Sequence, residues 1–91
     1  MSFEFDPEKS AANLAKHGID FEAARALWRD DDAFEIEARS TTEPRWALIG
    51  MIEGKHWTAF FTPRGNALRI ISVRRARDGE VQAYERRKEG H

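Results

Sequence analysis

One stretch decides the fold: Arg69-Ile70-Ile71-Ser72-Val73-Arg74-Arg75-Ala76. It starts as an apolar run with β-branched residues, which predicts a buried strand. Its arginines are costly to bury and stay protonated. Because a guanidinium group binds phosphate through two parallel hydrogen bonds, we expect this strand to deliver positive charge to a phosphodiester at its end.

Strand periodicity divides the residues of this stretch between two faces of the sheet. A period of two places Arg69, Ile71, Val73 and Arg75 on one face, and Leu68, Ile70, Ser72 and Arg74 on the other. The pleat loosens at a strand end, so we expect Arg74 and Arg75 to reach one groove there.

Three more strands come directly before this one. Apolar or alternating runs predict strands over residues 34–38, 45–52 and 56–62, with the last over 68–75. The turns between them are short, as in Glu53-Gly54-Lys55 and Pro63-Arg64-Gly65-Asn66. Short connections imply antiparallel neighbours, so the four strands are expected to form a meander.

The N-terminal third reads as a short strand followed by two helices. Asp6 and Pro7 form a strong helix start, and Gly18 suits a left-handed residue after a helix that ends at His17. Asp20 starts a second helix that should end near Trp28 or Arg29. The adjacent Asp30-Asp31-Asp32 is expected to be a solvated loop.

A final amphipathic helix is expected over residues 78–88. The predicted fold class is therefore α+β, with the order β-α-α-β-β-β-β-α. It is a small antiparallel sheet with two N-terminal helices against one face and a helix at the C-terminus. The chain has 91 residues, so we expect a single domain over residues 1–91.

Charge is distributed unevenly along the chain. Residues 1–43 hold five Lys/Arg and 11 Asp/Glu, a net charge of −6, whereas residues 64–91 hold eight and four, a net charge of +4. Such asymmetry indicates nucleic acid or a charged protein as partner. There are no cysteines, no leader-like start and no apolar run of membrane-spanning length. We therefore expect a cytoplasmic protein that contacts no membrane.

Metal and cofactor chemistry is not indicated. His17, His56 and His91 are scattered, and the three aspartates lack the spacing of a calcium loop. There is no phosphate-binding loop and no dinucleotide fingerprint. We expect no metal and no cofactor.

The basic residues remain as candidates: Arg64, Arg69, Arg74, Arg75 and Arg77, together with Lys16 and His17. Each has a plainer alternative. For Arg69 the alternative, with equal weight, is an ion pair with an acidic residue of the N-terminal half. His17 is either a helix-terminal cation or a proton shuttle. Tyr84 either packs on the sheet or binds at a site, and Trp28, Trp46 and Trp57 are expected in the core.

Several motifs, in order, resemble one family. They are the N-terminal Phe3-Glu4-Phe5-Asp6-Pro7-Glu8-Lys9, the run Asn13-Leu14-Ala15-Lys16-His17-Gly18-Ile19-Asp20-Phe21-Glu22-Ala23-Ala24, and Thr62-Pro63-Arg64-Gly65 followed by residues 69–76. Together they resemble the BrnT-type toxins of bacterial type II toxin–antitoxin systems. Val73 stands where that family usually has a small residue, and Phe5 where Trp is common.

The resemblance implies a RelE-like fold and a ribonuclease that arrests translation by cutting RNA without metal. It implies a BrnA-like antitoxin with a ribbon-helix-helix DNA-binding part, so that operator DNA is reached only through the antitoxin and the complex represses its own promoter. The alternative is a non-catalytic module that binds RNA or the antitoxin.

Residue roles follow by analogy. Arg74 and Arg75 would stabilise the phosphorane, and Lys16 or His17 would transfer protons. Arg64 would position the substrate, and Arg69, Arg77 and Tyr84 would help to bind it.

Overall fold

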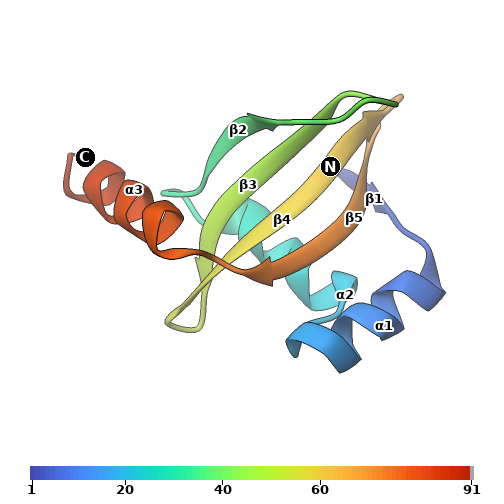
Figure 1. Cartoon of the computed structure of the whole chain (residues 1–91), viewed down its shortest axis with the longest axis horizontal. Helices are drawn as coiled ribbons and strands as arrows, with labels where there is room; N and C mark the ends of the chain where they lie inside the picture. The colour runs from blue at the N-terminus through green and yellow to red at the C-terminus, as the bar shows by residue number, and fades with distance from the viewer. Residues whose placement is uncertain (91) are drawn as a thin grey trace.

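The computed structural model describes residues 1–90, so His91 lies outside the described residues. Within that range, one sheet contains β1 (Ser2–Glu4), β2 (Phe34–Ala38), β3 (Arg45–Ile52), β4 (Lys55–Arg64) and β5 (Ala67–Arg75). The helices are α1 (Pro7–His17), α2 (Phe21–Ala24), the 3₁₀ helix η1 (Arg25–Arg29) and α3 (Asp78–Glu89). Figure 1 shows α1 and α2 on one side of the sheet and α3 near one end of it. The α+β class is confirmed.

The strands lie in the order β1-β5-β4-β3-β2. The antiparallel meander from β2 to β5 is confirmed by its pairing. β1, however, pairs in parallel with β5, with Ser2 opposite Ala67, so the sheet is mixed and the prediction of a purely antiparallel sheet is wrong. All the intervening helices and strands separate β1 from β5, so no tight turn forces the two to run in opposite directions.

The helix boundaries at the N-terminus follow from local capping. The Asp6 side chain accepts a hydrogen bond from the Glu8 amide at 2.9 Å. Gly18 has φ of 82° and its amide bonds the Leu14 carbonyl, which confirms both ends of α1. The second helix is shorter than predicted, because it tightens after Ala24 into η1.

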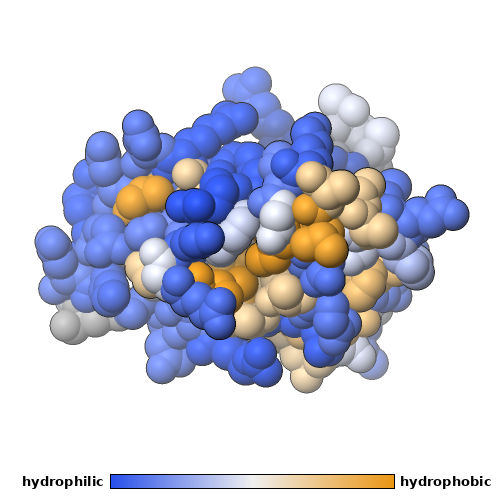
Figure 2. Space-filling view, turned by 90° about the horizontal axis from the view of Figure 1, so that it is seen from below, coloured by the Kyte–Doolittle hydropathy of each residue, from blue (hydrophilic) through white to orange (hydrophobic). Residues whose placement is uncertain are grey.

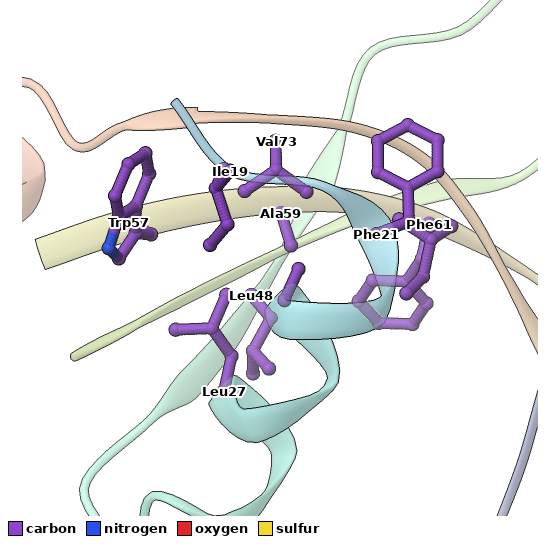
Figure 3. Packing of buried hydrophobic residues seen from close by; sticks show 10 residues of the cluster. Ile19, Phe21, Leu27, Leu48, Trp57, Ala59, Phe61 and Val73 are labelled. Carbon is purple, nitrogen blue, oxygen red and sulfur yellow. The ribbon is translucent and has the colours of Figure 1, made fainter. Parts of the chain in front are cut away.

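The core lies between the sheet and the α2–η1 segment (Figure 3). Leu27, on η1, is fully buried against β3. Gly50 permits this approach, since a Cβ at that position would stand 3.1 Å from the Leu27 side chain. Trp57 is buried in the core, and Trp28 and Trp46 pack against it, as expected.

A β-bulge in β5 changes which arginines share a face. The register shifts between Phe60 and Phe61, and Ile71 has no opposite residue on β4. Ile70 and Val73 can therefore both point into the core, with 2% and 0% exposure. The strict alternation predicted from the sequence is wrong. Arg69, Ser72 and Arg74 share the face of the sheet that points away from α2 and η1, here called the open face, whereas Leu68, Ile70, Val73 and Arg75 are on the helix side.

Polar side chains attach α1 to the rest of the molecule. Its buried residues are Ser10 and Asn13. The Asn13 amide accepts from the Val73 N–H at 3.1 Å and donates to the carbonyls of Val73 at 2.9 Å and Ile19 at 2.8 Å. The Ser10 hydroxyl accepts from the Phe21 amide at 2.9 Å. Asn13 thus takes the place of a neighbouring strand where β5 extends beyond its pairing with β1.

Candidate active site

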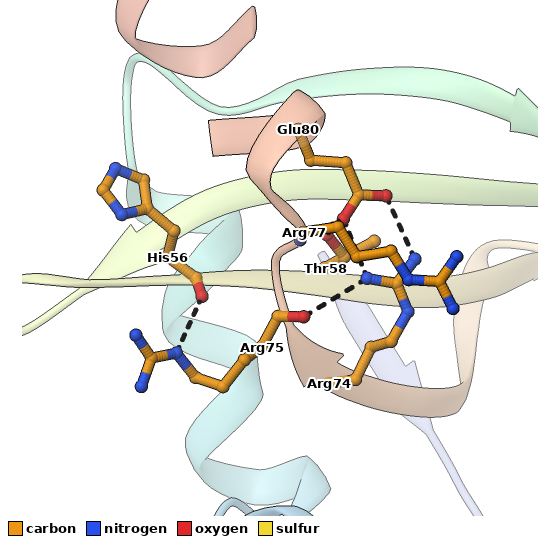
Figure 4. A network of polar contacts seen from close by, with 6 residues as sticks. All are labelled: His56, Thr58, Arg74, Arg75, Arg77 and Glu80. Atoms are coloured by element: carbon orange, nitrogen blue, oxygen red, sulfur yellow. Dashed lines mark hydrogen bonds and ion pairs between the residues drawn. The ribbon is translucent and has the colours of Figure 1, made fainter. Parts of the chain in front are cut away.

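The end of β5 gathers the six residues of Figure 4, here called the exit cluster. They come from β4, β5 and the start of α3, and they are His56, Thr58, Arg74, Arg75, Arg77 and Glu80. The Arg74 guanidinium lies 5.2 Å from the centre of the Phe60 ring, and that of Arg75 lies 5.4 Å from Trp57. The Phe60 and Trp57 rings are on opposite faces of β4, so Arg74 and Arg75 leave the end of β5 on opposite sides of the sheet. The expectation that both reach one groove is therefore wrong.

Glu80 is the centre of the cluster. Its carboxylate accepts hydrogen bonds from Arg74 Nη1 at 2.8 Å and Nη2 at 3.0 Å, from the Thr58 hydroxyl at 2.9 Å and from the Arg77 amide at 2.8 Å. Burial alone would raise the pKa of Glu80. The hydrogen bonds from Arg74, the Arg77 amide and Thr58, with the Arg74 charge, outweigh it and lower that pKa to about 2. Glu80 is therefore an ionised anchor and not a proton donor at neutral pH.

Arg74 and Arg75 differ in how many donors they leave free. Both terminal nitrogens of Arg74 bond Glu80, and Nη1 also donates to the Arg75 carbonyl at 3.2 Å. The exposed Arg75 donates only through Nε, to the His56 carbonyl at 3.3 Å, among residues 1–90. Its terminal nitrogens can thus form the two parallel bonds that phosphate accepts.

His56 is oriented by a carboxylate on α3. Its Nε2 lies 2.7 Å from Glu85 Oε2, and its ring meets Tyr84 edge-on with the centres 5.2 Å apart. The His56 side chain is 18% exposed, and within the described residues its Nδ1 has no hydrogen-bond partner. A histidine with one nitrogen on a carboxylate and the other unbonded has the arrangement of a general base.

Tyr84 fastens α3 to the loop after η1. It is 2% exposed, and its hydroxyl donates to Asp30 Oδ2 at 2.8 Å. The Asp30 carboxylate also accepts from the Met51 amide at 2.8 Å and the Asp32 amide at 3.0 Å. Burial and this bond raise the pKa of Tyr84. The pKa of Asp30 is lowered, because its hydrogen bonds outweigh the opposing effect of burial. The expectation of a merely solvated acidic loop is thus wrong for Asp30.

Two predicted site residues lie at the other end of β5. Arg69 Nη1 is 3.3 Å from Glu4 Oε1, and Arg64 Nη1 is 3.9 Å from the same atom. The ion pair considered as the alternative for Arg69 is therefore present. Arg69 precedes Arg74 by five residues, about 16 Å along a strand, so the two ends of β5 do not form one compact site.

The remaining predicted residues lie on helices. Arg77 is exposed at the start of α3, and its amide belongs to the exit cluster. Lys16 and His17 stand in the last turn of α1. Neither makes a hydrogen bond or an ion pair in the part of the chain that the structure describes.

Sequence reasoning missed Glu80, His56 and Asp30. Only Glu80 carries a local signal, because a Glu at the third position of a helix often bonds the backbone at its start. Residues 1–90 contain no group of three or more acidic, His or Cys side chains able to hold a metal, and no helix there could span a membrane. A hollow of about 700 Å³ lies away from the exit cluster, between residues 37 and 46.

The model of a family described as the ribonuclease toxin BrnT of type II toxin–antitoxin systems matches residues 5–80. That segment includes α1, the meander and every residue of the exit cluster, whereas Tyr84 and Glu85 follow it. Among curated proteins, no individual sequence matches the chain.

Proposed function

The chain belongs to the BrnT family of type II ribonuclease toxins, and we propose that it is a metal-independent endoribonuclease of RelE-like fold that inhibits translation in the cytoplasm. The observation that carries this proposal is the exit cluster. It combines exposed arginine donors with a carboxylate-oriented histidine at one end of the sheet. These are the groups that cleavage of RNA by its own 2′-hydroxyl requires.

In this reaction the 2′-oxygen attacks the adjacent phosphorus while the bond to the 5′-oxygen breaks. The products are a cyclic phosphate and a free 5′-hydroxyl, which takes its proton from solvent. Arg75 and the exposed Arg77 would bind the phosphate and stabilise its added negative charge. Because the side chains of Arg75 and His56 point to opposite faces of the sheet (Figure 4), the phosphate would lie across the end of the strands, between the two. Arg74, held by Glu80, would contribute a fixed positive charge on the open face.

Two histidines are candidates for the group that removes the 2′-hydroxyl proton. His17, like Lys16 beside it, is unpartnered on α1 within the described residues. His56 is held by Glu85, which fixes one tautomer and would stabilise the imidazolium once Nδ1 has accepted the proton. For that reason we assign the base to His56. A His56→Gln variant should lose cleavage that His17→Gln retains, and the reverse result would return the role to His17.

Type II toxins act with an antitoxin. We propose that the partner is a BrnA-like protein with a ribbon-helix-helix part, and that the complex represses its own promoter. The charge asymmetry of the chain makes their association salt-sensitive.

One observation favours a second function. Both terminal nitrogens of Arg74 are occupied by Glu80, so this arginine is less free to bind phosphate than expected. A non-catalytic module that binds RNA or the antitoxin does not need Arg74 to contact a phosphate, so the Arg74–Glu80 bonds are compatible with that function.

The test is incubation of purified, antitoxin-free protein with total RNA in EDTA. The wild type should degrade RNA, and an Arg74→Ala/Arg75→Ala variant should be at least 10²–10³-fold slower, by analogy with loss of an oxyanion donor. The matched control is Arg64→Ala/Arg69→Ala at the far end of β5. If the wild type binds RNA without cleaving it, the result would support the second function, a non-catalytic binding module. Equal degradation by the wild type and the Arg74/Arg75 variant would place the chemistry elsewhere.

A further inference from the structure

Helix α3 carries two carboxylates that organise the candidate site, yet it buries only one of its residues. Glu80 bonds Arg74, and Glu85 bonds His56. Of the twelve residues of α3, only Tyr84 is buried. Figure 2 shows a mainly hydrophilic surface at the end of the molecule where α3 lies in Figure 1. The place of Glu85 therefore depends on how its neighbour Tyr84 is held.

Tyr84 is held by Asp30. A buried hydroxyl needs a hydrogen-bond partner, and among residues 1–90 the Tyr84 hydroxyl has one, Asp30 Oδ2 at 2.8 Å. The same oxygen accepts from the Met51 amide of β3 at 2.8 Å. The backbone of Asp30 is fixed as well, since its amide bonds the Leu27 carbonyl at 3.2 Å and its carbonyl accepts from the Ala33 amide at 3.1 Å. Asp30 is thus a rigid link between β3 and α3.

The contacts of Asp30 form a closed cycle that includes His56. Met51, whose amide bonds Asp30, lies opposite His56 in the pairing of β3 with β4. The His56 ring meets the Tyr84 ring edge-on, and Tyr84 returns to Asp30. Glu85, next to Tyr84 on α3, lies 2.7 Å from His56 Nε2. Asp30 therefore joins the strand that pairs with the His56 segment to the helix that orients its imidazole.

The surroundings of Asp30 suit this link. A Cβ at Gly50 would stand 3.2 Å from Asp30 Oδ2, so the glycine lets the carboxylate approach β3. Lys88, one helical turn after Tyr84, lines the hollow beside Asp30 and presents a positive charge to it. Helix α3 thus directs both a hydroxyl and a cation at one carboxylate. The adjacent Asp31 is exposed.

We propose that Asp30 is a positioning residue of the ribonuclease: by holding Tyr84 it fixes the place of α3, and so maintains the Glu85 bond that orients His56. This rests on the proposed function, in which His56 is the base. Among residues 1–90, Asp30 makes no hydrogen bond to the exit cluster, so its effect passes through Tyr84. A reacting group must be held within about 0.5 Å of its productive place, which the residues behind it provide.

The first experiment compares RNA cleavage by Asp30→Ala with cleavage by Asp31→Ala, the matched control with the same change of charge. Asp30→Ala should lower kcat about ten- to hundredfold, because misplacing a reacting group by about 1 Å has an effect of this size. KM should change less than about twofold, since Asp30 does not touch RNA. Asp30→Asn keeps an oxygen for Tyr84 and should recover most of the lost rate, and Asp31→Ala should match the wild type.

The second readout needs no RNA. The His56 Nε2 proton bonded to Glu85 should give a downfield proton resonance by NMR, identified by its absence from His56→Gln. The resonance should persist in Asp31→Ala and disappear in Asp30→Ala. Tyr84→Phe removes only the hydroxyl, so it decides the matter if Asp30→Ala does not fold, and it should lose the resonance and about tenfold in kcat.

Circular dichroism checks that each variant is folded. Wild-type kcat with an unchanged His56 resonance in folded Asp30→Ala or Tyr84→Phe would overturn the proposal. A lowered kcat with the resonance intact would overturn it as well, because Asp30 would then act by another route than His56. If the wild type cleaves no RNA, the proposed enzyme fails, whereas loss of the resonance in Asp30→Ala and not in Asp31→Ala would still support the positioning of His56.

Discussion

Arg74 and Arg75 are neighbours of identical chemistry in opposite surroundings. Arg74 lies on the open face, bonded twice to Glu80 and stacked on Phe60. Arg75 lies on the helix side over Trp57, with its terminal nitrogens unbonded among residues 1–90. Two adjacent arginines in a sequence can therefore have different roles. Arg74 holds Glu80 and the start of α3 in place, whereas Arg75 has donors available for a ligand.

The largest effect that this contrast predicts is on cleavage by Arg75→Ala. Removing the free guanidinium should lower kcat/KM for an RNA oligonucleotide about 10²–10³-fold, because the phosphorane loses its bidentate donor. Stability should change by less than about 0.5 kcal/mol, since Arg75 is exposed. Single-turnover cleavage and thermal melting measure the two quantities. Arg75→Lys keeps the charge without the planar fork and should recover only part of the rate. Full activity in Arg75→Ala would reverse the roles of the two arginines.

The second prediction concerns the anchor of Arg74. Glu80→Gln should lower the free energy of unfolding by about 2–3 kcal/mol, because it leaves a partly buried guanidinium without its carboxylate and weakens the bond from Thr58. Urea unfolding gives the value. The control is Glu85→Gln, whose carboxylate is 44% exposed and should cost under about 1 kcal/mol. Equal losses in the free energy of unfolding for Glu80→Gln and Glu85→Gln would mean that Glu80 stabilises the fold no more than an ordinary surface carboxylate.

The third prediction is that acid lowers the free energy of unfolding through the Glu80 carboxylate. Glu80 has a pKa of about 2 in the folded protein against an ordinary value of 4.5. Because the folded value is the lower one, its contribution to stability is present above pH 4.5 and is lost as pH falls toward 2. From pH 5 to pH 3 the wild type should lose about 2 kcal/mol more than Glu80→Gln. Parallel stability curves for the two proteins across this range would contradict the assignment.

What the sequence could predict was decided by local interactions. The ends of α1 follow from Asp6 and Gly18, which act on the nearest backbone groups. The meander follows from short turns. The parallel pairing of β1 could not be predicted in this way, because it joins Ser2 to Ala67 across most of the chain.

Only part of the candidate site could be predicted, because the rest depends on contacts between segments far apart in the sequence. The arginines at the end of β5 are visible in the sequence, but the bulge at Ile71 depends on the register with β4, and it decides which of them share a face. The contact of Tyr84 with Asp30 joins residues 54 positions apart. No periodicity within one segment carries such information.

The smallest predicted effect lies at the far end of β5. Arg64→Ala/Arg69→Ala removes one exposed and one half-buried partner of Glu4, which is itself partly exposed, so the free energy of unfolding should fall by under about 1 kcal/mol. Cleavage should slow only a few-fold and through KM, since Arg69 lies about 16 Å from Arg74 along β5 and Arg64 is farther still, so both touch only a longer RNA. Oligonucleotides of increasing length measure this: the variant should match the wild type on the shortest substrate and fall behind on longer ones. A loss as large as that of Arg75→Ala on the shortest substrate would mean that chemistry depends on both ends of the strand.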